Sequence, residues 1–432
     1  MAAARPSNWR LAAYGALGLP LAMAALPIYV HVPKFYADTL GLSLASVGGM
    51  LLASRLFDAV QDPVLGWWSD RHRAKNGTRW FFVGIGAPML ALGMFGLFNP
   101  PVSGPSVLSW WLVANLLLVY TAFSVVTVSY QSHGAEIADD HVGRTRVTAW
   151  REGFSLLGVF AAAALPEFLK QSAGERAGFS LFSFIFAPLV LIAAAITIYR
   201  SPLAHPRVPP PAPMFGALTL PFRNPQFRRL LFIFVLNGIA ASIPATLVLF
   251  FIQDVVQRPD LTAFFLIAYF AAGAAGLPMW VWLSRRIGKG RSWFVAMILS
   301  ICAFVWAFLL GAGQVLPFFI ICVMSGVGLG ADLALPPSIL ADVIDLDEER
   351  GAGRNEGAYF GLWNLVTKLN LALAAGVALP LLEGFGYAPS TQNATRALFT
   401  LAAVYALLPC ILKACAALAL LGSPFFRPED SP

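Results

Sequence analysis

The chain alternates long apolar stretches with short breaks that are charged or rich in proline and glycine. A helix that crosses a bilayer needs about 20 mostly apolar residues. Stretches of about that length fall at 11–36, 43–69, 80–98, 107–132, 147–169, 179–199, 228–253, 261–284, 292–313, 315–343, 357–382 and 395–421. The sequence therefore predicts an all-α, multi-pass membrane protein with twelve transmembrane helices.

Composition excludes several other classes of protein. Of the 432 residues, 58% are hydrophobic and 12% are charged, whereas soluble proteins are about 45–50% apolar and about 25% charged. The net charge of +7 fits a membrane protein, in which Lys and Arg gather in cytoplasmic loops, so we expect no nucleic-acid partner. The four cysteines and five histidines lack the spacing of metal, redox or catalytic motifs. We therefore expect no enzyme and no cofactor apart from a coupling ion.

Positive charges favour one orientation in the membrane. With both termini inside, the inward segments hold about four times as many Lys and Arg residues as the outward loops. We therefore expect both termini in the cytoplasm. We further expect a monomer in the bacterial inner (plasma) membrane, with the lipid bilayer as its surroundings.

The longest break divides the chain into two halves. It contains P-R-V-P-P-P-A-P, which disfavours a helix because proline lacks an amide donor. We assign 1–200 to an N-terminal six-helix half, 201–226 to a cytoplasmic linker and 227–432 to a C-terminal six-helix half. An internal repeat supports this division into two halves, since W-S-D-R-H-R at 68–73 resembles W-L-S-R-R-I at 282–287. Such parallel repeats build major facilitator transporters, although basic inward loops also resemble one another by composition alone.

The second apolar stretch carries three charges where lipid would disfavour them. Arg55, Asp58 and Asp62 lie in R-L-F-D-A-V-Q-D-P, and each charge at the midplane costs about 2.5–3.5 kcal/mol. Their i,i+3 and i,i+4 spacing places them on one helical face. With the amide of Gln61, the two carboxylates offer oxygen atoms that suit an alkali cation or a proton. The alternative is an internal salt bridge to Arg55 that only stabilises the bundle.

The eleventh stretch carries one isolated cation. Lys368 lies in G-L-W-N-L-V-T-K-L-N, and a lysine halfway along an apolar helix needs an anion. We expect it to face Asp58 and Asp62 across a central cavity; the alternative is a lysine that snorkels to a lipid headgroup. Shifting the carboxylate pair by the repeat distance reaches Ala272 and Gly276, so the cation site is expected in the N-terminal half.

Several motifs together resemble the glycoside–pentoside–hexuronide:cation symporters (the melibiose permease family) of the major facilitator superfamily. They are Y-A-D-T-L-G-L-S at 36–43, R-L-F-D-A-V-Q-D-P-V-L-G at 55–66, G-A-E-I-A-D-D at 134–140, N-P-Q-F-R-R-L at 224–230, L-A-D-V-I-D-L-D at 340–347 and E-G-A-Y-F-G-L-W-N-L-V-T-K-L at 356–369. The resemblance covers nearly the whole chain. It implies the major facilitator fold and cation-coupled transport of a small-molecule solute by alternating access.

The resemblance also implies roles for individual residues. Asp58 and Asp62 match the aspartates that bind the coupling sodium ion or proton, and they would be the metal ligands if sodium is the ion. Gln61 stands where the family usually has asparagine, and Ser124 matches a hydroxyl from the fourth helix. For the solute, Arg151 and Lys368 match family residues, and Trp363 and Asn364 flank the lysine. Thr127 and Gln131 fall near the positions of a fourth-helix acid and tryptophan, and Gly18 replaces a first-helix acid.

These departures leave the solute open. Two carboxylates that would accept hydrogen bonds from sugar hydroxyls are missing, and such a loss changes the preferred substrate. The solute is therefore a small polar molecule such as a glycoside or, alternatively, an amphipathic, lysophospholipid-like molecule. A non-transporting receptor or scaffold is the hypothesis from a different class.

A gating motif is matched in part. Gly66, Asp70, Arg71 and Arg73 fit the major facilitator pattern G-x-x-x-D-R-x-x-R incompletely. A carboxylate here would accept hydrogen bonds from the backbone amides at nearby helix N-termini and so hold the inward side closed. We therefore predict that Asp70, Arg71 and Arg73 take part in gating.

Overall fold

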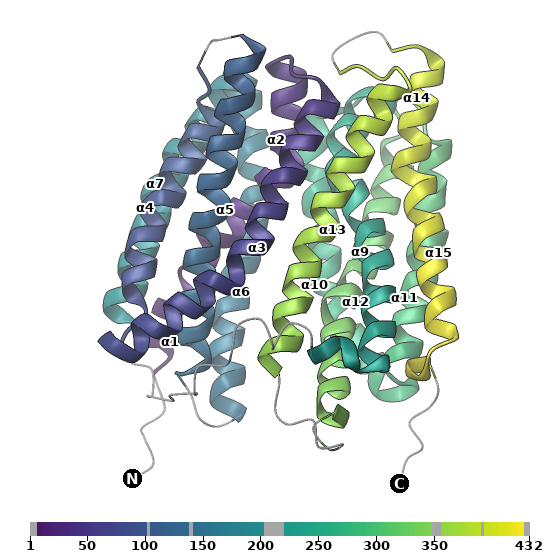
Figure 1. The fold of residues 1–432 in the computed structure, drawn as a ribbon. Helices are drawn as coiled ribbons and strands as arrows, with labels where there is room; N and C mark the ends of the chain where they lie inside the picture. Colours follow the sequence, from purple (N-terminus) through teal and green to yellow (C-terminus); the bar gives the residue numbers. More distant parts are fainter. Residues whose placement is uncertain are drawn as a thin grey trace. The chain divides into compact units, whose positions relative to one another are not determined.

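The chain folds into helices throughout the part that the computed structural model describes (Figure 1). The described residues are 7–101, 104–137, 141–202, 220–347, 349, 356–389 and 393–426. The chain divides into two compact units, one made of Met1–Leu42 and Met50–Ala212, the other of Ser43–Gly49 and Pro213–Pro432. We call them the first and the second unit.

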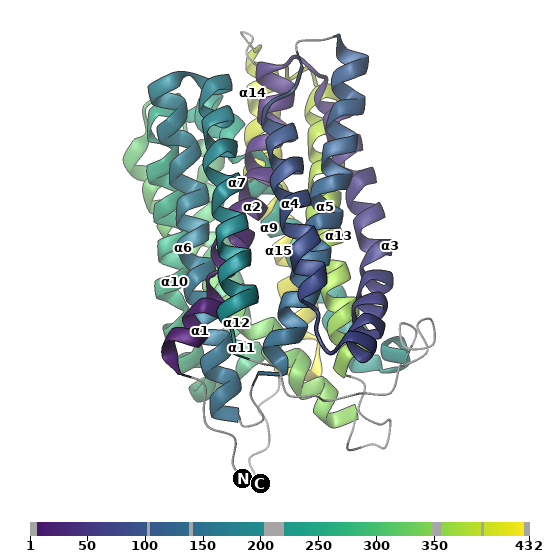
Figure 2. The ribbon, with the colours of Figure 1, turned by 90° about the vertical axis from the view of Figure 1, so that its left-hand side faces the viewer.

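The helices that begin in the first half of the chain are, in order, α1 (Asn8–Gly15), α2 (Gly18–Lys34), η1 (Phe35–Thr39), α3 (Leu44–Asn76), α4 (Trp80–Phe98), α5 (Pro105–Ala135), α6 (His141–Ala173) and α7 (Glu175–Arg200). Within the first unit, α4 packs against both α5 and α7, and α2 packs against α6 (Figure 2). An aromatic cluster joins η1, α4 and α7. The ring centroids of Phe35 and Phe98 each lie 4.9 Å from the ring centroid of Phe179.

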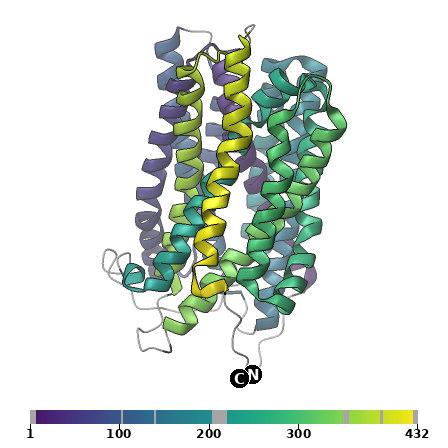
Figure 3. The same ribbon diagram turned by 90° about the vertical axis from the view of Figure 1, so that its right-hand side faces the viewer.

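The helices of the second unit are, in order, η2 (Leu220–Arg223), α9 (Pro225–Phe251), η3 (Ile252–Val256), η4 (Pro259–Leu261), α10 (Thr262–Ile287), α11 (Lys289–Phe304), η5 (Val305–Leu309), α12 (Val315–Asp347), α13 (Glu356–Gly384), α14 (Thr395–Ala402), η7 (Ala403–Leu407), α15 (Leu408–Leu421) and η8 (Pro424–Phe426). The run α14–η7–α15, in yellow, continues as one long helix (Figure 3). The core of the second unit centres on Trp280 and Trp293, which are buried among α9, α12 and α13.

Most of these helices suit a bilayer. In the described part of the chain, 11 helical segments are long and apolar enough to cross a membrane. The remaining long helix, α3, has 33 residues but is less apolar because it carries Arg55, Asp58 and Asp62. The twelve expected stretches therefore each correspond to helical structure, and the expected all-α membrane fold is confirmed.

The first expected stretch is broken where the sequence analysis expected one continuous helix. Residues 11–36 fall in α1, α2 and the start of η1. The chain breaks between α1 and α2 because Pro20 lacks the amide that would bond the carbonyl of Ala16. That carbonyl instead accepts from Leu19 N at 3.3 Å. The break directs α2 against α6, where a Cβ on Gly18 would lie 2.9 Å from the carbonyl oxygen of Arg151.

Equivalent turns follow the second long helix of each repeat. Gly77 ends the helix that contains W-S-D-R-H-R with φ of 74°, and Gly288 ends the helix that contains W-L-S-R-R-I with φ of 88°. Glycine enters this left-handed region without steric cost. The two basic motifs thus share a local structure as well as a sequence pattern.

Candidate functional site

Asp58 lies at the centre of a buried polar cluster in the first unit. The residue is 1% exposed, and its Oδ1 accepts a hydrogen bond from Ser124 Oγ at 2.8 Å. The same oxygen accepts from Gln61 Nε2 at 3.1 Å. On the other side, Arg55 Nη1 lies 3.6 Å from Asp58 Oδ2. The structure therefore brings together three of the expected cation-site residues, Asp58, Gln61 and Ser124.

The helix α5 completes this cluster with two residues that the sequence analysis missed. Thr121 Oγ1 donates to Gln61 Oε1 at 2.9 Å, which fixes the orientation of the amide. The guanidinium of Arg55 lies over the ring of Tyr120, 4.0 Å from its centroid. The available signal was the spacing from Ser124, since Thr121 lies three residues before it and therefore on the same helical face.

The cluster offers the chemistry of a monovalent cation site. Asp62 lies one turn beyond Asp58 on α3 and is partly buried, so its carboxylate belongs to the same helical face. Carboxylate, amide and hydroxyl oxygens are hard ligands that suit hard cations. Among the described residues, no group of three or more His, Cys, Asp and Glu side chains is placed to hold a metal. A cation here would draw on both carboxylates together with neutral oxygens.

The solute residues expected in the first unit have different surroundings. Arg151 on α6 donates to Glu152 Oε1 from Nη2 at 2.6 Å and from Nε at 3.0 Å. Thr127 has a buried hydroxyl without a hydrogen-bond partner among the residues that the structure describes. Gln131, one helical turn further along α5, is exposed. Gly18 fits closely against the Arg151 carbonyl. The expected solute residues of the first unit therefore offer the cation of Arg151, the hydroxyl of Thr127 and the amide of Gln131.

The expected solute residues of the second unit lie along α13. Trp363 is buried, and its ring stacks on Phe234 at a centroid distance of 3.7 Å. Asn364 is exposed, and Lys368 is partly buried. Because Lys368 and Asp58 belong to different units, the expectation that they face each other stays a prediction.

The second unit also contains a largely buried ion pair that the sequence analysis missed. Asp332 Oδ2 on α12 accepts from Lys413 Nζ on α15 at 2.9 Å. Its Oδ1 accepts from Asn237 Nδ2 on α9 at 2.9 Å and from Trp293 Nε1 on α11 at 2.8 Å. One carboxylate therefore connects four helices. The signal in the sequence was a charge well inside each of two apolar stretches, Asp332 in 315–343 and Lys413 in 395–421, whereas the other charges there, Asp342 and Arg396, lie at the ends.

At the end of α3, the partly matched gating motif meets an acid from another segment. Arg73 Nη2 lies 2.6 Å from Glu136 Oε2, and Arg79 Nη2 lies 3.2 Å from Glu136 Oε1. Glu136 belongs to the motif G-A-E-I-A-D-D, to which we had assigned no role. Arg71 is exposed, and the side chain of Asp70 lies outside the described part of the structure. The gating role of these residues stays a prediction.

Comparison with known proteins gives a consistent family. Residues 11–424 match the family described as MFS/sugar transport protein. The chain is 22% identical to the putative glycoside/cation symporter YagG of Escherichia coli, covering 88% of this chain and 84% of that protein. It is 25% identical to the sphingosine-1-phosphate transporter MFSD2B of Mus musculus, covering 92% of this chain and 85% of the relative.

A solved structure shows the same fold. The crystal structure of a bacterial homologue of the human lysosomal transporter Spinster matches with a TM-score of 0.68 at 15% identity, covering 98% of this chain and 97% of that one. Family, relatives and fold together identify an integral membrane transporter of the major facilitator superfamily, and the expectation that the chain is not an enzyme is confirmed.

Proposed function

Because the chain belongs to the MFS/sugar transport protein family, we propose that it is a secondary symporter that couples a monovalent cation to the movement of a small solute. The observation that carries this proposal is the cluster around Asp58. It combines a buried carboxylate with hydroxyl and amide oxygens from α3 and α5. A charged group inside a membrane helix marks an ion or substrate pathway more often than a structural contact.

In this proposal the ion, sodium or a proton, is bound by Asp58 and Asp62 with help from Gln61 and Ser124. Binding neutralises negative charge in the first unit and thereby changes the electrostatics that the solute and Lys368 experience. Rocking of the two units then exposes both ligands on the other side of the membrane. Moving one charge inward across 100 mV supplies about 2.3 kcal/mol, or roughly fiftyfold accumulation. Asp70, Arg71 and Arg73 would act in gating.

Two classes of solute are in question. A glycoside or related sugar is favoured by the family and by the likeness to a glycoside/cation symporter. Arg151, Thr127, Gln131, Trp363 and Asn364 would supply its polar and stacking contacts.

An amphipathic, lysophospholipid-like solute is favoured by the packing around Gly18. A carboxylate there would meet the Arg151 carbonyl and the Ser155 hydroxyl at 2.9 Å from its Cβ, so the acid that would bind sugar hydroxyls has no room. The likeness to a sphingosine-1-phosphate transporter agrees with this second class. An anionic headgroup would suit the cations of Arg151 and Lys368.

The proposal includes a location and an assembly state. A monomer in the bacterial inner membrane with both termini cytoplasmic fits the distribution of basic residues and the bacterial relatives.

Uptake by proteoliposomes tests the proposed function. Purified protein in liposomes receives imposed sodium or proton gradients and a panel of glycosides, uronides and lysophospholipid-like molecules. We expect accumulation of one class, driven by one ion and abolished in Asp58→Asn. Uptake that ignores both gradients would refute cation coupling, and no uptake across a broad panel would favour a receptor or scaffold.

A further inference from the structure

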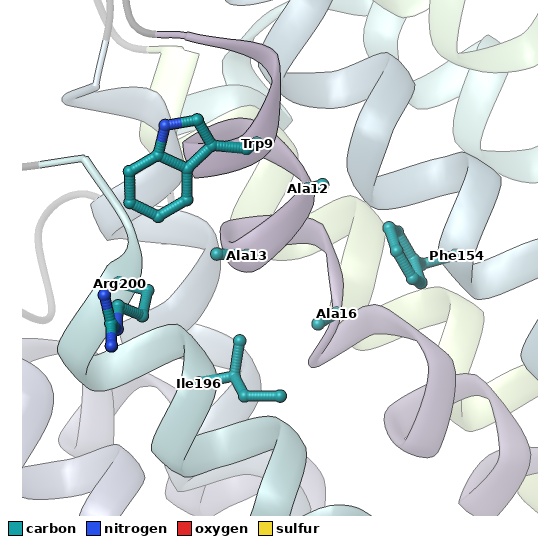
Figure 4. Close-up of a pocket in the computed structure, with 7 residues that line it drawn as sticks. All are labelled: Trp9, Ala12, Ala13, Ala16, Phe154, Ile196 and Arg200. Atoms are coloured by element: carbon teal, nitrogen blue, oxygen red, sulfur yellow. The ribbon is translucent and has the colours of Figure 1, made fainter.

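A groove in the first unit lies outside the proposed cation and solute sites. It has a volume of about 540 Å³ and lies where the start of α1, α6 and the end of α7 meet (Figure 4). Its walls include Ala12 from α1, Ala16 directly after α1, Phe154 from α6 and Ile196 from α7. Trp9 and Arg200 lie near one another at one end (Figure 4). Arg200 is the one charged side chain among the described residues that line the groove.

The groove follows from how α1 is held. Thr197 Oγ1 on α7 donates to the carbonyl oxygen of Ala13 at 2.9 Å, which fixes α1 against α7. Gly15 allows α1 to approach α6, because a Cβ there would lie 2.8 Å from the Trp150 carbonyl oxygen. With the helices fixed at these contacts, the short side chains of Ala12 and Ala16 leave space between them.

The end of the groove at Trp9 and Arg200 is positively charged. Arg200 is exposed and makes no hydrogen bond or ion pair with any residue that the structure describes. Arg10 lies next to Trp9, with its guanidinium 5.4 Å from the ring centroid. Arg146 donates to Asn8 Oδ1 at 2.6 Å at the start of the same helix. Among the described residues, no carboxylate lines the groove, so this part of the chain supplies no acid at its basic end.

The surroundings are those of a membrane interface. Trp9 is 54% exposed and Tyr199, beside Arg200, is 82% exposed, and such aromatic residues concentrate where the headgroups of a bilayer begin. Ile196 is 40% exposed on a helix that is long and apolar enough to span a membrane. An apolar groove beside an exposed apolar helix face that ends at the arginine side chains of Arg200 and Arg10 has the two chemistries of a phospholipid.

We propose that this groove binds one anionic glycerophospholipid. Its headgroup phosphate pairs with Arg200 and Arg10, and one acyl chain lies along Ala12 and Ala16 between Phe154 and Ile196. The apolar walls assign the site to a lipid instead of a free phosphate ion, since an ion would gain contacts only at the rim. This proposal depends on the membrane location and is independent of the solute and the coupling ion.

Lipid binding to the purified full-length protein in mild detergent tests the proposal. The affinities for phosphatidylglycerol and phosphatidylcholine are measured by native mass spectrometry on the parent, Arg200→Gln and the filled variant Ala12→Phe. One arginine near a headgroup is worth about fivefold in affinity for an anionic lipid. We expect Arg200→Gln to lose about that factor for phosphatidylglycerol and nothing for phosphatidylcholine. Ala12→Phe should weaken both lipids.

Arg285→Gln is the matched control, because Arg285 is an exposed arginine near the end of α10 in the second unit. It should leave phosphatidylglycerol binding within twofold of the parent. Equal parent affinity for the two lipids, or equal losses in Arg200→Gln and Arg285→Gln, would overturn the proposal. Competition by millimolar inorganic phosphate would also overturn it, by showing that the rim alone holds the anion. Circular dichroism and gel filtration verify that each variant is folded.

Discussion

Replacing Asp58 by asparagine removes a charge while preserving the shape of its cluster. The amide oxygen of asparagine can accept the hydrogen bonds from Ser124 and Gln61 that Asp58 Oδ1 accepts now. The packing of α3 against α5 is therefore expected to persist. What changes is the interaction with a bound cation and with Arg55, which lies 3.6 Å from the carboxylate.

The expected loss of affinity is large because the site is buried. Asp58 is 1% exposed, so bulk water screens it weakly. Two unit charges 4 Å apart interact by about 4 kcal/mol at an effective dielectric constant of about 20. That energy corresponds to about a thousandfold in the dissociation constant of the cation. The charge of Arg55, no longer balanced by Asp58, repels the cation and acts in the same direction.

Equilibrium binding measures this loss without knowledge of the solute. Radioactive sodium is titrated onto purified parent and Asp58→Asn protein, and proton uptake is counted on acidification of weakly buffered samples. We expect the variant to lose saturable sodium binding or, if the ion is a proton, to take up fewer protons than the parent. Thr121→Val is the matched control, because Thr121 donates a hydrogen bond to Gln61 and carries no charge; a change below tenfold is expected. Folded Asp58→Asn protein with parental sodium affinity and proton uptake would refute the assignment.

Three further predictions follow from other contacts. Asp332→Asn should destabilise the purified protein by about 3–5 kcal/mol because it leaves the Lys413 ammonium buried without its counter-charge; an unchanged midpoint of thermal unfolding would contradict this. Glu136→Gln removes the carboxylate that Arg73 and Arg79 share, so a cysteine reporter near Arg73 should react faster with a water-soluble maleimide, and equal rates would exclude a gate there. Gly18→Asp should reduce the yield of folded protein through its clash with α6, whereas a parental yield would show that the first helix can accommodate an acid.

Hydrophobic length predicted the fold well because each transmembrane helix is specified by its own residues. The stretch that contains Arg55, Asp58 and Asp62 is the long helix α3, although its charges make it the least obvious span. The break at Ala16 was missed, even though Pro20 stands four residues later and removes the required amide. A proline signal was therefore present but was outweighed by the length of the apolar run.

The candidate site was less accessible from the sequence because its contacts join distant segments. Ser124 was expected beside Asp58 through family resemblance, and the two residues do meet. Glu136 was missed because its partners Arg73 and Arg79 lie 63 and 57 residues away in the chain. Asp332 was missed because its partners lie 39, 81 and 95 residues away, which is beyond any helical period. Local spacing identifies which residues share a face, whereas the partner on another helix depends on packing.

The ion pair between Arg55 and Asp58 has a consequence for the voltage dependence of the proposed cycle. With both aspartates ionised, Arg55, Asp58 and Asp62 sum to a charge of one negative unit, where the aspartates alone would sum to two. One monovalent cation then neutralises the cluster of the first unit. Considered by itself, the loaded unit would reorient without moving net charge across the membrane. The empty unit would return with one negative charge, and the membrane field acts on that step. The tethered arginine thus favours one cation per cycle and places the voltage sensitivity of this unit in the empty return step.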